Sequence, residues 1–131
     1  MALPSPLPDA LVELIAERFR AIGEPTRIRI LDRLRQGEAS VQELTLALGS
    51  SQQNVSKHLA LLQHAGIVER RRDGNYSYYR IADDSVLALC ETVCGSIQRS
   101  VGTLAATLDT AFNGVAATRL SKDRITEKQA R

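Results

Sequence analysis

The sequence lacks several features that mark whole classes of protein. It has no run of eighteen apolar residues, so no membrane-spanning helix is expected. Its first residues, MALPSPLPDA, carry no basic region followed by an apolar one, which argues against a secretory signal. Two cysteines are too few for a disulfide framework, which agrees with a reducing compartment. These absences predict a cytoplasmic protein with no membrane partner.

What is present is ordinary in amount and uneven in distribution. The 131 residues are 44% hydrophobic and 24% charged, which suits a single domain. The net charge is only +2, but residues 50–80 carry five basic and two acidic side chains, whereas residues 81–111 carry one basic and four acidic ones. A basic segment beside an acidic one predicts a surface for a polyanion, held on a scaffold that does not touch it.

Apolar spacing and turn residues predict the order of the elements. A helix capped by Asp9 runs to Gly23, and a second begins at Pro25. Short helical patterns follow in SVQELTLALG, which opens with a capping box, and in SSQQNVSKHLALLQHAG. Two β-prone runs, 67–72 and 75–81, flank Asp73-Gly74 and predict a hairpin. A long helix then starts at Asp83 or Asp84 and ends near Asn113-Gly114.

This order predicts a mainly α protein with a small β-hairpin, arranged as a winged helix-turn-helix. The expected organisation is an extended N-terminal arm over residues 1–8, a DNA-binding and dimerisation domain over 9–111, and a flexible basic C-terminal tail over 112–131.

The candidate DNA contacts follow from the position of the second helix of the motif. Its N-terminal part enters the major groove, where Asn and Gln pair with adenine, Ser serves several bases and Lys suits phosphates. The contacts predicted here are Ser51, Gln52, Gln53, Asn54, Ser56 and Lys57, with Arg70, Arg71 and Arg72 on the wing. The alternative is that Ser50 and Gln53 only cap a solvated helix and that the arginines line a solvated strand edge.

Three stretches carry a resemblance to a known family. AIGEPTRIRILDRL, SVQELTLALGSSQQNVSKHLALLQHAGIVERRRDGNYSYYRI and the helix after them resemble the ArsR/SmtB family of winged-helix repressors over about residues 11–100. The resemblance implies a homodimer through the first and last helices, operator binding, and release by a metal, a metalloid or an oxidant. The apolar positions expected at the dimer interface are Leu14, Val86, Leu89, Val93, Ile97 and Val101.

The effector sites that the family uses are mostly missing. The third helix, where the family has a Cys-x-Cys site, reads Val41-Gln42-Glu43-Leu44, and no histidine follows residue 64 to complete a site on the last helix. Cys90 and Cys94 remain, four residues apart on one helix face. A thiophilic ion (Hg, As, Cd, Cu or Zn) or an oxidant could be sensed there. Alternatively, both thiols simply continue an apolar stripe.

The leading interpretation is therefore a dimeric DNA-binding transcriptional repressor, released from its operator through Cys90 and Cys94, and not an enzyme. A winged-helix protein–protein adaptor is the main alternative, and it would need an apolar patch in place of the glutamines. A thiol oxidoreductase would need Cys-x-x-Cys near a β-α-β unit, and neither is present.

Overall fold

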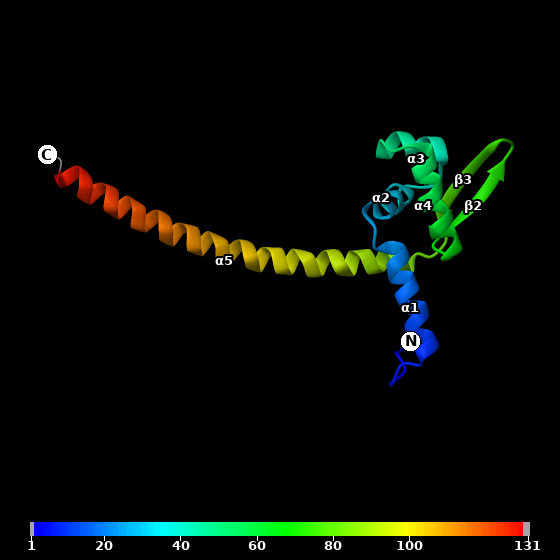
Figure 1. The fold of residues 1–131 in the computed structure, drawn as a ribbon, viewed down its shortest axis with the longest axis horizontal. Helices are drawn as coiled ribbons and strands as arrows, with labels where there is room; N and C mark the ends of the chain where they lie inside the picture. Colours follow the sequence, from blue (N-terminus) through cyan, green and yellow to red (C-terminus); the bar gives the residue numbers. More distant parts are fainter. Residues whose placement is uncertain (1, 130–131) are drawn as a thin grey trace. The chain divides into compact units, whose positions relative to one another are not determined.

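A computed structural model describes the backbone of residues 2–129 and the side chains of residues 2–114. The chain forms two compact units, Met1–Ala88 and Leu89–Arg131. The division falls inside the last helix, at neither of the boundaries expected from the sequence. The first unit contains the helix-turn-helix and the wing, and Figure 1 shows its helices α2 to α4 beside the strands β2 and β3.

Two helices open the first unit. Residues 2–8 form neither helix nor strand, and α1 (Asp9–Ile22) follows Pro8. Asp9 therefore lies in the first turn and does not cap the helix as predicted, although its charge still suits the helix N-terminus. Helix α2 (Pro25–Leu34) has proline at its first position, as expected, and Glu24 caps it by accepting a 2.9 Å hydrogen bond from the Arg27 N–H.

The helix-turn-helix consists of α3 (Val41–Leu48) and α4 (Gln52–His64). Ser40 caps α3: its hydroxyl accepts a hydrogen bond from the Glu43 N–H at 3.1 Å and donates one to the Glu43 carboxylate at 3.2 Å. Gly49 ends α3 with φ 63° and ψ 29°, a left-handed conformation that glycine adopts at low cost. The predicted Ser40–Glu43 pair and tight turn are both present, with the Ser40 hydroxyl and not its backbone N–H bonded to the Glu43 carboxylate.

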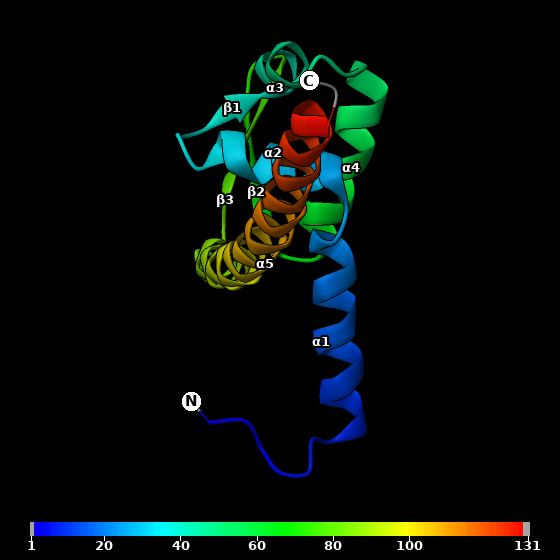
Figure 2. The same cartoon turned by 90° about the vertical axis from the view of Figure 1, so that its left-hand side faces the viewer.

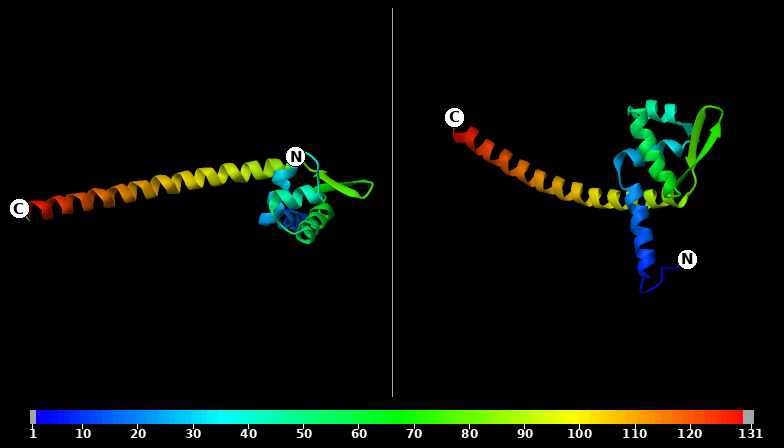
Figure 3. Two further views of the ribbon diagram at one scale, coloured as in Figure 1. Left: turned by 90° about the horizontal axis from the view of Figure 1, so that it is seen from above. Right: turned by 45° about the vertical axis from the view of Figure 1, so that its right-hand side comes forward.

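The wing is a three-stranded antiparallel sheet. Strands β2 (Val68–Asp73) and β3 (Tyr76–Ile81) form the hairpin, and β1 (Ala39–Ser40) pairs with the other edge of β3, giving the order β1-β3-β2. Figure 3 shows the hairpin projecting from the helices, and Figure 2 shows β1 leading into α3. The turn residues are Gly74-Asn75, one position later than predicted, with Gly74 at φ 61°. Strand β1 was not predicted, because two residues are too few to show a period.

The core of the first unit lies where α2, α3, α4 and the sheet meet. Its largest fully buried side chains are Ile30, Leu31, Leu44, Val55, Leu59, Leu62, Ile67 and Val68. Val86, at the start of the last helix, is only 2% exposed. It therefore belongs to this core and presents no surface to a second chain, which corrects its assignment to the dimer interface.

The last helix, α5 (Ser85–Gln129), is longer than predicted. It continues through Asn113-Gly114, and Gly114 keeps a right-handed backbone. One glycine costs a helix about 1 kcal/mol, and the alanines on either side of this pair favour the helix. In the part of the chain that the structure describes, no helix is long and apolar enough to cross a membrane.

Candidate nucleic-acid interface

Helix α4 presents a polar face outward because its three largest buried residues lie together on the side that faces the core. Val55, Leu59 and Leu62 are fully buried, and the opposite side of the helix carries the exposed Gln53, Ser56 and Lys57. Gln52 is exposed in the first turn. The N–H groups of the first turn of a helix lack partners within it, and they favour an anion such as phosphate.

Ser51 and Asn54 make hydrogen bonds within the turn and the first turn of α4. The Ser51 hydroxyl accepts a 3.1 Å hydrogen bond from the Asn54 N–H and so caps the helix. The half-buried Asn54 side chain donates from Nδ2 to the Ser50 hydroxyl at 2.9 Å. The cap is therefore built by Ser51 and Asn54 and not by Ser50 and Gln53, and this leaves the Gln53 amide unengaged by any described residue.

A polar cluster fixes α4 to α1 and α2. Arg27 donates from Nε to the Ala21 carbonyl at 2.6 Å and from Nη2 to the Arg20 carbonyl at 3.1 Å, and its Nη1 lies 3.1 Å from Nδ1 of His58 on α4. The Glu24 carboxylate lies 3.7 Å from Nδ1 of His58. Arg27 could not be singled out from the sequence, because nothing in the pattern of an amphipathic helix distinguishes an arginine that contacts three elements.

The charge state of Glu24 suits this cluster. Burial acts to raise the pKa of Glu24, but hydrogen bonds from the backbone N–H groups of Arg27 and Thr26 and the charges of His58 and Arg27 outweigh it. The net effect lowers the pKa, so the carboxylate that caps α2 stays ionised.

Two arginines of the wing, Arg70 and Arg72, are not engaged in ion pairs within the described part of the chain. Residues opposite each other on antiparallel strands share a face of the sheet, and Arg70 pairs in register with Tyr79, which is 7% exposed. Arg70 and Arg72 therefore share the face that carries the buried Val68, and β2 packs on α4. Among the described residues, neither arginine has an ion-pair partner. Both can meet phosphates beside α4.

Arg71 lies on the opposite face and is already engaged. Its guanidinium makes two hydrogen bonds to Glu38, from Nη2 at 2.6 Å and from Nε at 3.2 Å, and is 3.7 Å from Asp73. It also stacks over the Tyr78 ring, 4.8 Å from its centre. The hydrogen bonds with Glu38 raise the pKa of Arg71 and lower that of Glu38 against the effect of burial. The nearby Arg80 is likewise paired with Glu69.

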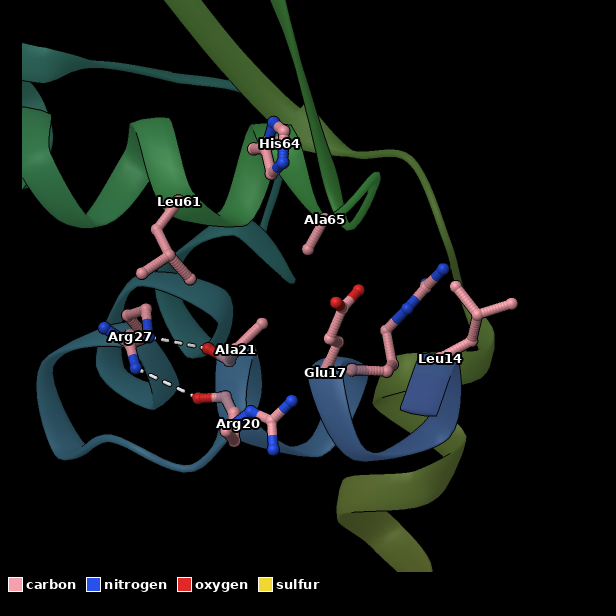
Figure 4. A pocket seen from close by; sticks show the side chains of 9 residues that line it. Leu14, Glu17, Arg20, Ala21, Arg27, Leu61, His64 and Ala65 are labelled. Carbon is pink, nitrogen blue, oxygen red and sulfur yellow. Dashed lines mark hydrogen bonds between the residues drawn. The ribbon is translucent and has the colours of Figure 1, made fainter. Parts of the chain in front are cut away.

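A pocket of about 640 Å³ opens between α1 and the C-terminal end of α4 (Figure 4). Apolar side chains from both helices line it, including Leu14 and Leu61, and Arg27 closes one side through its two carbonyl contacts. Leu14 is 62% exposed and Leu61 is 42% exposed. The pocket is therefore mixed in character, since the charged side chains of Glu17, Arg20 and Arg27 lie between these two leucines.

The two cysteines are free thiols on α5, with Cys90 half-buried and Cys94 exposed. No group of three or more His, Cys, Asp or Glu side chains within residues 2–114 is arranged to hold a metal ion. The apolar residues near them on α5 are open to solvent: Val93, Ile97 and Val101 are each about half exposed. Leu89 is half-buried.

The known proteins that resemble this chain are helix-turn-helix transcriptional regulators. The helix-turn-helix domain family matches residues 22–71. The transcriptional regulator KmtR of Mycobacterium tuberculosis is 42% identical over 86 residues, 66% of this chain and 66% of KmtR. The uncharacterized regulator Rv0081 of the same organism is 35% identical over 111 residues, 84% of this chain and 97% of Rv0081. The chain spans 39% and 59% of two further curated mycobacterial relatives.

Solved structures agree with the winged helix-turn-helix. The crystal structure of Rv0081 superimposes with a TM-score of 0.66 at 35% identity, covering 72% of this chain and 96% of that one. The solution structure of Mb0332 from Mycobacterium bovis, described as a homodimeric winged helix-turn-helix DNA-binding domain and a possible ArsR-family regulator, gives 0.65 at 33% identity, covering 75% and 94%.

Proposed function

Because this chain belongs to the ArsR/SmtB family of helix-turn-helix transcriptional regulators, which are not enzymes, we propose that it is a dimeric repressor that binds double-stranded operator DNA. The observation that carries this proposal is the outward face of α4. Gln53, Ser56 and Lys57 are exposed there, and Arg70 and Arg72 lie on the sheet face that adjoins the same helix.

In this proposal α4 lies in the major groove. Gln52 and Gln53 make hydrogen bonds to base edges, with adenine as the favoured partner, and Ser56 adds a contact that tolerates several bases. Lys57 and the first-turn N–H groups of α4 bind phosphates and set the register. Arg70 and Arg72 extend the phosphate contacts along the wing. Ser51 and Asn54 support this face by capping the helix.

The proposed dimer uses the apolar surfaces that the single chain leaves open. These are Leu14 on α1 and the stripe of Leu89, Val93, Ile97 and Val101 on α5. A symmetric pair would bury both sets and hold two α4 helices at a fixed spacing for two half-sites. The homodimeric state of Mb0332 supports this assembly.

The proposed signal acts at Cys90 and Cys94. One chain supplies two thiols, which underfill a tetrahedral zinc site, but two chains across a symmetry axis would supply four. Thiolates favour thiophilic ions, and a peroxide would instead convert two thiols into a disulfide with release of water. Either event would alter α5 and hence the spacing of the two α4 helices. The alternative is that the thiols only pack in the dimer interface, with another effector or none.

The test is binding of the full chain to its own upstream DNA, measured by fluorescence anisotropy across a salt series, with a scrambled duplex as the competitor. A repressor should prefer its operator by about 10³-fold or more over random sequence. A protein–protein adaptor predicts no preference and no linear dependence of log K on log salt. The second outcome would reject the proposed function.

A further inference from the structure

We infer that Arg71 is a positioning residue of the wing and not a DNA contact: its contacts with Tyr78 and Glu38 join the three strands of the sheet. Arg71 comes from β2, Tyr78 from β3 and Glu38 from the residue before β1, and the sheet order is β1-β3-β2. The arginine side chain thus crosses its neighbouring strand to reach the far edge of the sheet. This set of three residues is called the wing clasp below.

The three consecutive arginines of β2 lie on two different faces of the sheet. Arg71 pairs in register with Tyr78, so both lie on the face opposite to Arg70 and Arg72. The face of Arg70 and Arg72 also carries Val68 and Tyr79, which are buried, and it adjoins α4. A wing that contacts DNA with the face adjoining α4 therefore turns Arg71 away from the duplex.

The charge of Arg71 is also already balanced. Glu38 accepts two hydrogen bonds from it, at 2.6 and 3.2 Å, and Asp73 lies 3.7 Å away. Bidentate pairs between arginine and carboxylate are among the stronger charge-assisted bonds, and this one is reinforced by the Tyr78 ring. A phosphate would have to displace the Glu38 carboxylate, which belongs to the same chain and is held beside Arg71 by the pairing of the strands. Arg71 should therefore release no counterion from DNA.

The clasp has a direct mechanical connection to the DNA-reading motif. Glu38 precedes β1 by one residue, and the second residue of β1, Ser40, caps α3. The clasp consequently fixes the wing to the segment that begins the helix-turn-helix. Its loss should let the hairpin move relative to α4 in the free protein, so that binding must first restore the position of the wing, while Arg70 and Arg72 make the same phosphate contacts in the complex. This inference rests on the proposed DNA-binding function for its effect on affinity, but not for its effect on the wing itself.

The decisive measurement is the salt dependence of operator binding by full-length variants. Arg72→Ala should lower the slope of log K against log salt by about 0.9 for each lost phosphate contact, which is about 1.8 for a dimer that loses one contact from each chain. Arg71→Ala should weaken binding several-fold at every salt concentration and leave the slope unchanged. A slope lowered in Arg71→Ala as in Arg72→Ala would overturn the inference.

The substitution Glu38→Ala distinguishes a phosphate contact from a positioning role for Arg71, because the two roles predict opposite changes in operator affinity. If Arg71 were a phosphate contact held back by Glu38, Glu38→Ala would free it and tighten binding. If the clasp positions the wing, Glu38→Ala should weaken binding. Glu69→Ala is the matched control, because it removes a carboxylate from the same face of β2 without touching the clasp. Tighter binding by Glu38→Ala than by Glu69→Ala would overturn the inference.

A measurement without DNA keeps the two proposals separable. Hydrogen exchange of the β2 and β3 amides in the free protein should be faster in Arg71→Ala and Glu38→Ala than in wild type, and unchanged in Arg72→Ala. If wild type binds no operator, the proposed function fails while this exchange pattern still supports the clasp. Unchanged exchange in both clasp variants would reject the clasp, whatever the DNA result. Thermal unfolding of each variant checks that it is folded.

Discussion

The side-chain amide of Asn54 is bonded to the Ser50 hydroxyl at 2.9 Å, while the neighbouring Gln53 is exposed and bonded to no described residue. Two adjacent amides at the start of α4 thus have different environments. One is committed to the turn that joins the helices, and the other is exposed where a base edge would lie. Residue type alone made them equivalent candidates for reading DNA.

Gln53→Ala should therefore lower sequence discrimination while leaving the fold intact. A good bidentate contact to a base is worth about 1–3 kcal/mol of discrimination, and non-specific binding should persist because phosphate contacts supply it. The measurement is the ratio of operator to random-sequence affinity. Gln63→Ala, an exposed change near the other end of α4, is the control. Equal discrimination by Gln53→Ala and wild type would disprove the assignment.

Val93→Glu should dissociate the proposed dimer and abolish tight operator binding. Val93 is 47% exposed in the single chain, so the change leaves the monomer core undisturbed, but it would bury a carboxylate in the interface. Sedimentation velocity at micromolar concentration reports the assembly. Ala106→Glu places the same group on the opposite side of α5 and should remain dimeric. A monomeric wild-type protein would contradict the dimer itself.

Cys90→Ser together with Cys94→Ser should keep operator binding and lose the response to the inducer. Coupling of about 1–3 kcal/mol between effector and DNA is typical of allosteric proteins, so wild type should weaken by roughly 5- to 150-fold on induction. Operator release is measured with Hg(II), Cd(II), Cu(I), Zn(II), arsenite and peroxide on both proteins. If none of these releases the wild type, the thiols are packing atoms, and the double variant should then show only reduced stability.

Acid should destabilise the fold through carboxylates that are held ionised. Hydrogen bonds from Ser85 together with the charge of Arg18 lower the pKa of Asp83, and the Arg71 hydrogen bonds lower that of Glu38. The native state then binds fewer protons than the unfolded chain, whose groups titrate near their ordinary values of 3.8 and 4.5. The stabilisation is complete above those values and is lost as the pH falls through the lower, native ones.

The check is urea unfolding of wild type and Asp83→Asn between neutral pH and pH 3. Wild type should keep its unfolding free energy down to about these ordinary values and lose it as the pH falls further, and the variant should start lower and lose less below them. An identical pH dependence for the two proteins would mean that Asp83 does not contribute.

Most of the fold could be predicted from the sequence, because its turns and helix ends use residues with one strong conformational preference. Gly49, Gly74 and the Ser40–Glu43 pair are such residues, and each lies at or next to the junction it predicted. The end of α5 was predicted wrongly because one Asn-Gly pair was weighed without the alanines around it. Strand β1 was missed because its pairing with β3 spans almost forty residues of sequence.

The candidate site was less predictable than the fold. Sequence position grouped Arg70, Arg71 and Arg72 together, but strand alternation puts Arg71 on a different face, and only the three-dimensional structure reveals Glu38 beside it. The same holds for Asn54, whose hydrogen bond to Ser50 depends on the geometry of the turn. It also holds for Val86, which is buried by residues far away in the sequence.

The ion pair between Arg18 and Asp83, 2.7 Å long, links the first helix to the residues that start the last one, since Asp83 also accepts the Ser85 N–H bond. Both side chains are partly exposed, so dissolved ions screen the pair. Salt would therefore act on this protein twice. Its cations compete with the protein for DNA phosphates at the contacts proposed for α4 and the wing, and its ions also loosen the connection between the two helices proposed to build the dimer. Dimer dissociation should consequently become easier over the same range of ionic strength in which the operator is released.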